Sequence, residues 1–451
     1  MREKLLKGTL LFASGQIVFP ILNLVAIAIV VRALGKEQYG VVALALSLYS
    51  IGSMIMDLGF RSWMVSELAR YLGQDRMGAA HSLLRLMTVY EGVSSVAIAA
   101  IIGVVAGFDA HISTAGQWII VAYILITPVQ HFLTTILYAW SRFAPMQMFA
   151  LLESCIRLAL VAGLFLFGSL TSDLALATYP FALLVSALCV IPATWPLVRQ
   201  VLSAPAESIN ASALRRQGTH VLLGGAVRAV RTNAPVWLIN DALGIAAVAV
   251  YSVASRAFAV VVMLFRALES AVFPAMSELV GRTGGADRAI QLGEKAVKYS
   301  LIIALATLPF AYALSPWGIR VVFGAQFLES VTLFRLMLFA LPFVTLMHVQ
   351  RPLYFSIRRA DLLFACYTAA SVLSLAALWV ALRVWGLAGG AIETIVFYIT
   401  VVILGHLLLS RAGARLRLGH MLRLRFADVG EMVGMLQPAM RFFTSASQRA
   451  R

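Results

Sequence analysis

Three arginines occur inside segments that otherwise have the composition of membrane-spanning helices. Arg228 and Arg231 interrupt the apolar stretch that begins near Gly218, and Arg256 lies near the middle of the next apolar segment. A guanidinium at bilayer depth costs about 2.5–3.5 kcal/mol on insertion scales, so such residues usually face a protein interior or a water-filled cavity. The guanidinium stays protonated and binds phosphate or carboxylate oxygens through paired N–H donors. The sequence therefore predicts a cavity at membrane depth that binds an anion.

Two further arginines are candidates for the same substrate-binding site. Arg157 follows Glu153 by four residues, a spacing that favours an ion pair on one helix face, although Arg157 could still contribute to the site. Arg335 lies close to the outer end of its segment, where a long side chain can also reach the membrane interface. We therefore keep both residues as candidates, after the three central arginines.

Four acidic residues in or near apolar segments are candidates for ion coupling or for ion pairing. Glu91, Glu153 and Glu393 lie within apolar segments, and Asp57 lies near the inner end of another. A partly buried carboxylate can titrate, as a proton-coupled carrier requires. It can equally pair with an intramembrane arginine, and we favour pairing for Glu91 and Glu393. Asp57 is expected to pair with Arg61.

The composition defines the class of protein. Of 451 residues, 61% are hydrophobic and only 12% are charged, whereas soluble domains have about 25% charged residues. The sequence therefore predicts an all-α polytopic membrane protein. The net charge of +16 does not indicate nucleic-acid binding, because the basic residues cluster in short loops, as the positive-inside rule predicts.

No metal, cofactor or catalytic motif is expected. The three cysteines are far apart in apolar segments, so we predict packed thiols rather than a disulfide or a metal site. His131 and His406 are isolated and have no ligand spacing around them, which also predicts packed side chains. The chain is therefore predicted to be neither an enzyme nor a cofactor-binding protein.

Twelve apolar segments are long enough to cross a bilayer, which requires about 20 helical residues. Their predicted ranges are 8–33, 38–62, 83–107, 116–140, 147–169, 175–197, 218–241, 246–272, 297–319, 330–351, 361–384 and 387–410. Basic residues concentrate in alternate connections, which predicts that both termini are cytoplasmic.

The segments divide into two halves of six. We predict an N-terminal bundle at 1–200, a cytoplasmic linker at 201–217, a second bundle at 218–410 and a basic cytoplasmic tail at 411–451. Short matches between the halves, such as Ser-Glu-Leu at 66–68 and 277–279, indicate an internal repeat. Repeats with the same orientation are related by an axis along the membrane normal, with a cavity between them. The excess of arginine in 218–272 predicts that the second half carries the anion-docking face.

The first two segments carry small motifs in a characteristic order. They are Arg-x-Leu-Gly at 32–35, Tyr39-Gly40, and Asp57 followed by Gly59. In their order and spacing they resemble the start of bacterial polysaccharide-biosynthesis flippases of the O-antigen type, within the multidrug/oligosaccharidyl-lipid/polysaccharide superfamily. The resemblance implies a V-shaped, two-bundle fold with alternating access. It implies no invariant catalytic residues.

The same resemblance implies a substrate and partners. The substrate would be an undecaprenyl-pyrophosphate-linked oligosaccharide, moved from the cytoplasmic to the periplasmic leaflet of the bacterial inner membrane under a H⁺ or Na⁺ gradient. The partners would be the lipid bilayer, a polysaccharide polymerase and a chain-length regulator. We expect a monomer and no nucleic acid.

Two alternative functions remain open. A multidrug antiporter of the same superfamily would need net acid in its cavity, whereas this chain has arginine there. A membrane polysaccharide polymerase or glycosyltransferase would usually carry a large outside loop or an acid-rich catalytic segment. A peptidoglycan-precursor flippase typically has 14 spans, and the tail at 411–451 supplies none.

Overall fold

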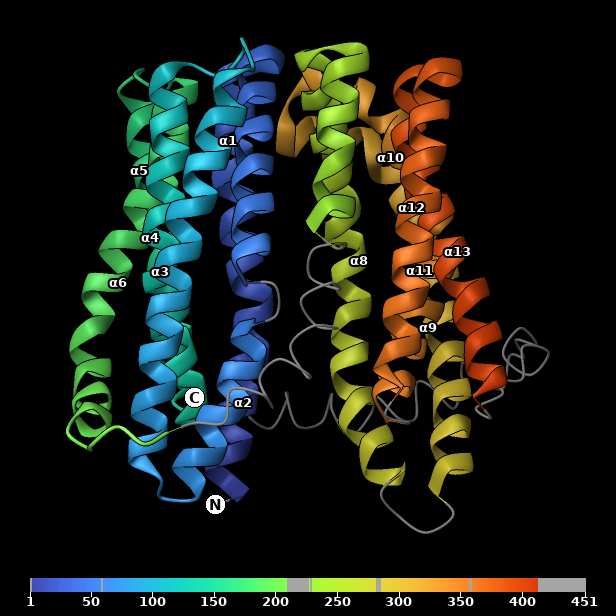
Figure 1. Cartoon of the computed structure of the whole chain (residues 1–451). Helices are drawn as coiled ribbons and strands as arrows, with labels where there is room; N and C mark the ends of the chain where they lie inside the picture. Colours follow the sequence, from blue (N-terminus) through green and yellow to red (C-terminus); the bar gives the residue numbers. More distant parts are fainter. Residues whose placement is uncertain are drawn as a thin grey trace, which may run out of the picture. The chain divides into compact units, whose positions relative to one another are not determined.

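The computed structural model describes residues 2–57, 60–208, 227, 229–280, 285–356 and 359–412. These residues are helical almost throughout, and no strand occurs among them. The first helices are α1 (Arg2–Asp57), α2 (Phe60–Gly73), α3 (Met77–Gly107), α4 (Thr114–Ala139), α5 (Phe143–Leu166) and α6 (Ser172–Leu202). A further helix includes residues 229–243. The later elements are α8 (Ile245–Val280), α9 (Gly285–Phe323), η1 (Ala325–Phe327), α10 (Glu329–Met337), η2 (Leu338–Ala340), α11 (Leu341–Ser356), α12 (Ala360–Trp385), η3 (Gly386–Ala388) and α13 (Gly389–Arg411) (Figure 1).

Nine helical stretches of the described residues are long and apolar enough to cross a membrane. Two of them, Val18–Asp57 and Asp361–Arg411, have 40 and 51 residues. Each contains two of the spans predicted from the sequence, which meet at Gly35 and at η3. The predicted span 218–241 lies partly outside the described residues. The prediction of an all-α polytopic membrane protein is confirmed.

The Arg-x-Leu-Gly motif forms the bend between the first two spans. Gly35 has φ 74° and ψ −176°, a conformation that glycine adopts without a steric penalty. Arg32, one turn earlier, donates from Nε to the carbonyl oxygen of Val322 at 3.0 Å. Its guanidinium also donates to the carbonyl of Val321. These carbonyls end α9 and have no partner within their own helix, so Arg32 acts as their cap.

The Tyr39-Gly40 motif is a packing motif. The Tyr39 side chain is 1% exposed, and its ring meets Phe327 edge-on at 6.1 Å between centroids. Gly40 lies against the backbone carbonyl of Ile245, where an added Cβ would collide. Both residues therefore join α1 to short segments that are distant in sequence.

The chain forms two compact units. Unit 1 contains Met1–Val253 and Ile319–Ser330, and unit 2 contains Ala254–Gly318 and Val331–Arg451. Helices α8 and α9 contribute residues to both units. The bundle boundaries at 200 and 218 remain a prediction.

Unit 1 is built around α1 and α4. Helix α1 packs against α3, α4, α5 and α6, and α4 packs against α3 and α6. The short helix α2 is amphipathic, and its apolar residues Met64 and Leu68 are fully buried in a cluster with Leu83 of α3. Its polar face carries Arg70, paired with Glu67.

The chain after α6 is attached to the start of α3. The Glu207 carboxylate lies 2.8 Å from the Arg76 guanidinium, and the Glu207 backbone N–H donates to the carbonyl of Gly78 at 3.1 Å. The hydrogen bond from Arg76 to Glu207 raises the pKa of Arg76. His81 Nδ1 lies 2.7 Å from the Ala204 carbonyl. The first part of the predicted linker therefore contacts Arg76, Gly78 and His81, while 209–217 lie outside the described residues.

We expect Gly78→Ala to destabilise the protein, because a Cβ at this position would collide with the carbonyl of Pro205. Overpacking costs about 1–3 kcal/mol, which should lower the thermal unfolding midpoint of the detergent-purified protein. The matched control is Gly92→Ala on the same helix, where a Cβ meets nothing within 4 Å. Equal midpoints for the two variants would contradict the close approach at Gly78.

In unit 2, α11 and α12 pack against α13. The Tyr354 hydroxyl donates to the Gly405 carbonyl at 2.8 Å, and Gln350 Nε2 donates to the Val402 carbonyl at 3.2 Å. Cys366 is buried in the same cluster, as predicted, and all three cysteines are free thiols. Cys155 and Cys189, however, are exposed on the protein surface, so the prediction that they pack inside the protein is wrong.

Candidate functional site

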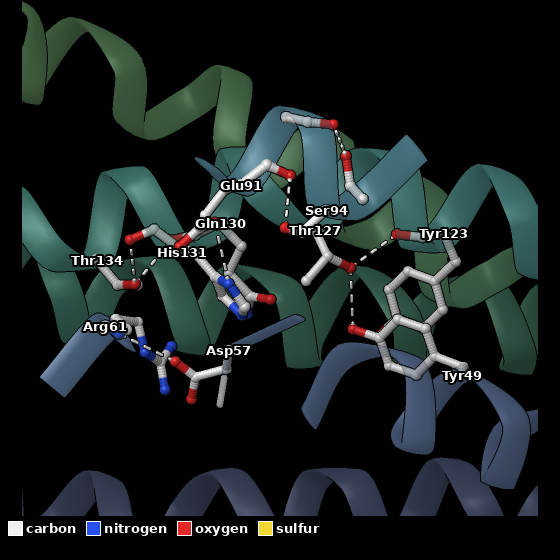
Figure 2. Close-up of polar contacts among 12 residues, drawn as sticks. Tyr49, Asp57, Arg61, Glu91, Ser94, Tyr123, Thr127, Gln130, His131 and Thr134 are labelled. Carbon is white, nitrogen blue, oxygen red and sulfur yellow. Dashed lines mark hydrogen bonds and ion pairs between the residues drawn. The ribbon is translucent and has the colours of Figure 1, made fainter. Parts of the chain in front are cut away.

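A carboxylate and an imidazole meet in the interior of unit 1. Glu91 of α3 is 2% exposed, His131 of α4 is 5% exposed, and His131 Nδ1 lies 3.1 Å from Glu91 Oε2 (Figure 2). The sequence favoured an arginine as partner of Glu91 and a merely packed His131. The structure contradicts the first prediction, because the polar partner of Glu91 is His131. His131 is packed in the interior, as predicted, and in addition contacts Glu91.

Glu91 is incompletely satisfied by the protein. Its second oxygen, Oε1, is buried and has no hydrogen-bond partner among the described residues. An ionised carboxylate in a low-dielectric interior is costly unless it is paired and hydrogen-bonded. The geometry therefore favours a site where a proton resides on the carboxylate or on the imidazole.

A stripe of polar side chains along α4 includes His131. Tyr123, Thr127, His131 and Thr135 occur every fourth residue, so they share one helix face, and all four are buried. Tyr49 of α1 stacks on Tyr123 with ring centroids 3.5 Å apart and an interplanar angle of 6°. The Tyr49 hydroxyl lies 3.2 Å from Thr127 Oγ1 (Figure 2). The stripe thus places hydroxyl groups one helical turn from the Glu91–His131 pair.

Arg157 of α5 is a buried cation that forms no salt bridge with a carboxylate among the described residues. Arg157 is 8% exposed, and its guanidinium lies 4.6 Å from the centroid of the Tyr179 ring of α6. Its Nε is buried and has no hydrogen-bond partner among the described residues. The expected direct ion pair with Glu153 does not form in this part of the chain. Glu153 accepts instead from Gln130 Nε2 at 3.4 Å.

Arg335 has a structural task in unit 2. Pro316 lacks an N–H, so the carbonyl of Tyr312, four residues earlier, loses its helical partner. Arg335 Nε donates to that carbonyl at 3.2 Å and to Ser315 Oγ at 3.0 Å. Its guanidinium also lies 4.3 Å from the centroid of the Tyr312 ring. Arg335 therefore contributes to packing, and its role in substrate binding remains a prediction.

The remaining candidate arginines are distributed over both units. Arg228 lies outside the described residues. Arg231 is partly buried in unit 1 and Arg256 is partly buried in unit 2. The common docking face predicted for these three arginines on the second half remains a prediction.

The remaining acids have local partners. Asp57 accepts a hydrogen bond from the backbone N–H of Arg61 at 3.2 Å, so it caps the start of α2 rather than pairing with the Arg61 guanidinium (Figure 2). Glu393 of unit 2 is 1% exposed and accepts from the Thr394 hydroxyl at 3.3 Å. No group of three potential metal-ligating side chains occurs in the described ranges.

Sequence reasoning missed the partners of Glu91 and Arg157, although a signal was present. Helices α3 and α4 form an antiparallel hairpin, and Glu91 and His131 lie at similar distances from its loop, 108–113. Arg157 and Tyr179 are similarly placed about the loop between α5 and α6. Because each residue advances about 1.5 Å along a helix, positions equidistant from a short loop lie at the same depth.

Comparison with known proteins places this fold. A family model described as polysaccharide biosynthesis protein matches residues 5–280, more than half of the chain. No curated protein sequence matches the chain significantly.

Solved structures of several transporters have the same fold. The lipid II flippase MurJ, in an inward closed conformation, has a TM-score of 0.69 at 14% identity, over 93% of this chain and 91% of that chain. An inward-facing multidrug-resistance MATE transporter has a TM-score of 0.66 at 16% identity, over 89% and 99%. A Pyrococcus furiosus transporter of the MOP superfamily, described as having a binding pocket of reverse polarity, has a TM-score of 0.64 at 14% identity, over 90% and 95%.

Proposed function

Because this chain belongs to the polysaccharide biosynthesis protein family, we propose that it carries a lipid-linked oligosaccharide across the membrane. The proposed substrate is an undecaprenyl-pyrophosphate-linked glycan. It is transferred from the cytoplasmic to the periplasmic leaflet of the bacterial inner membrane, with both termini of the protein in the cytoplasm. The proposed role is transport rather than catalysis, upstream of a polysaccharide polymerase and a chain-length regulator.

The family match is the observation that carries this proposal. It concerns polysaccharide biosynthesis, and the fold is shared with a protein described as a lipid II flippase. A lipid-linked glycan is the polysaccharide precursor that a polytopic membrane protein is suited to move, because its sugar head group is polar and its lipid tail is soluble in the bilayer.

The buried arginine of unit 1 supports an anionic substrate. Arg157 places N–H donors in the interior of a membrane-spanning helix bundle, and its Nε has no hydrogen-bond partner in the described part of the chain. A pyrophosphate has oxygens that accept paired N–H donors from guanidinium groups. Arg228, Arg231 and Arg256 are further proposed ligands, on the basis of their sequence positions.

The test uses the purified full-length protein in liposomes. The probe is an undecaprenyl-pyrophosphate disaccharide with a fluorophore on the sugar, and translocation is measured as loss of access to an external reducing agent. We expect the wild-type protein to translocate the probe and Arg256→Gln to lose most of this activity. The control is Arg383→Gln, because Arg383 stacks on Trp379 in the last turn of α12.

Two results would count against the proposal. The first is a wild-type protein that leaves the probe in place but exports a lipophilic cationic dye under a proton gradient, which would favour the multidrug antiporter. The second is full activity of Arg256→Gln together with Arg231→Gln, which would remove these arginines from the substrate site.

A further inference from the structure

We propose that Glu91 and His131 form a proton-binding site that couples transport in this protein to a H⁺ gradient. This inference rests on the proposed transport function and adds the identity of the coupling ion. The carboxylate of α3 and the imidazole of α4 are in contact at 3.1 Å, are nearly inaccessible to solvent and lie within two membrane-spanning helices.

The donor set favours a proton over a metal cation. Hard cations such as alkali and alkaline-earth ions take several oxygen ligands, usually carboxylates, carbonyls and waters. The contact here supplies one carboxylate oxygen and one imidazole nitrogen. Imidazole changes charge near physiological pH and exchanges protons readily. A pair of this kind is therefore better suited to hold a proton than Na⁺.

The charge of the pair depends on the number of protons that it holds. With one proton, the pair is neutral overall, either as carboxylate and imidazolium or as carboxylic acid and neutral imidazole. Loss of that proton leaves a carboxylate beside a neutral ring, and gain of a second leaves an imidazolium beside a neutral acid. Either net charge is costly in a low-dielectric interior. The singly protonated pair therefore fits the buried positions of Glu91 and His131, and loss of the proton requires hydration of Glu91.

No other charged side chain neutralises this pair in the described part of the chain. The other titratable side chains at nearby positions on the packed elements are Tyr49 and Asp57 on α1, Arg61 on α2, Arg85 and Tyr90 on α3, Tyr123 on α4, Glu153 and Arg157 on α5 and Tyr179 on α6. None of these forms a hydrogen bond or an ion pair with Glu91 or His131. Among the described residues, His131 is therefore the group that contacts the Glu91 carboxylate.

The polar stripe of α4 provides a path for the proton. Thr127 lies one helical turn from His131, and its hydroxyl is in contact with the hydroxyl of Tyr49. One turn is about 5.4 Å along the axis, which a single water molecule can bridge. Hydroxyl groups and water accept and donate protons in turn. The polar stripe therefore offers the Glu91–His131 pair a route toward the N-terminal end of α4, at the loop 108–113.

The first test measures proton binding directly. The full-length protein in liposomes is titrated with acid and base during infrared spectroscopy, and both the carbonyl stretch of a protonated carboxyl group and the stretches of an ionised carboxylate are followed. We expect one such band to disappear in Glu91→Gln and its titration to shift in His131→Gln. The control Glu329→Gln removes an exposed carboxylate that pairs with Lys36, and should leave the band unchanged. A spectrum in which Glu91→Gln loses no titrating band would overturn the proposal.

The second test measures coupling. Translocation of the undecaprenyl-pyrophosphate disaccharide is followed in proteoliposomes under a pH gradient alone or a Na⁺ gradient alone. We expect wild-type translocation to be stimulated by the pH gradient only, and Glu91→Gln and His131→Gln to lose that stimulation. Stimulation by Na⁺ alone would overturn the proton site and leave the flippase function intact.

The two proposals can fail separately. If the wild-type protein moves no disaccharide under any gradient, the proposed substrate is wrong, while the infrared band still reports whether Glu91 binds a proton. If the disaccharide moves but Glu91→Gln retains its pH dependence, the substrate stands and the proton site falls.

Discussion

Replacing Arg157 by glutamine is expected to abolish export of the surface polysaccharide while the protein accumulates in the membrane at close to the normal level. The guanidinium stacks on Tyr179, and its buried Nε has no hydrogen-bond partner among the described residues. Removing the guanidinium should therefore change the stability of the fold little but weaken binding of the proposed pyrophosphate strongly. A hydrogen bond to a charged group contributes about 1.5–3 kcal/mol, or roughly 10- to 150-fold in affinity. Surface polysaccharide and membrane-protein level are measured in a strain whose own copy of the gene is deleted.

The Arg157 experiment has two controls. Arg157→Lys keeps the positive charge but loses the planar fork of N–H donors, and we expect partial export from it. Arg199→Gln removes an arginine from the last turn of α6 and should leave export unchanged. Full export by Arg157→Gln would contradict a role for this residue in substrate binding.

Substitution of Gly40 by valine is expected to prevent accumulation of folded protein. A Cβ at Gly40 would collide with the backbone oxygen and carbon of Ile245, and a backbone cannot move aside as a flexible side chain can. Overpacking of this kind costs about 1–3 kcal/mol or more, a large share of the stability of a folded domain. The measurement is the yield of monodisperse protein in detergent, with Gly163→Val as the control, since a Cβ there meets nothing within 4 Å. A normal yield of Gly40→Val would show that α1 and the start of α8 can separate without loss of the fold.

The fold class could be predicted from the sequence because membrane spans are determined by composition and length. Apolar segments of about 20 residues are visible without tertiary information. The bend at Gly35 and the small residue at position 40 also came from the sequence, as elements of a family motif. The physical reasons are visible only in the structure: Gly35 has a positive φ, and Gly40 lies against the backbone of Ile245.

The candidate site could be predicted only in part. Intramembrane charge singled out Glu91 and Arg157, because burial of charge is expensive anywhere in a bilayer, and the structure buries both side chains; their roles in transport remain predictions. Their partners could not be read from spacing along one helix, since they lie on neighbouring helices. The i,i+4 rule favoured Glu153 as the partner of Arg157. That rule describes isolated helices, and here the ring of Tyr179 from α6 competes successfully for the guanidinium.

The cysteines show that hydrophobicity does not predict which side chains of a membrane helix are buried in the protein. Being apolar, it was expected to pack inside the protein, yet only Cys366 does. For a membrane helix, lipid is as suitable an environment for an apolar side chain as the protein interior. Hydrophobicity alone therefore cannot tell which face of such a helix is buried.

Arg335 donates to the carbonyl of Tyr312, which Pro316 leaves without a helical donor. Positions 316 and 335 are therefore expected to covary among related sequences. A residue other than proline at 316 would donate its own N–H to this carbonyl. An arginine at 335 would then lose an acceptor, and its positive charge would be less well satisfied. A chain that lost the arginine first would leave the carbonyl exposed. Each substitution is best tolerated when the other is also present, so proline at 316 and arginine at 335 are expected to occur together in members of the family.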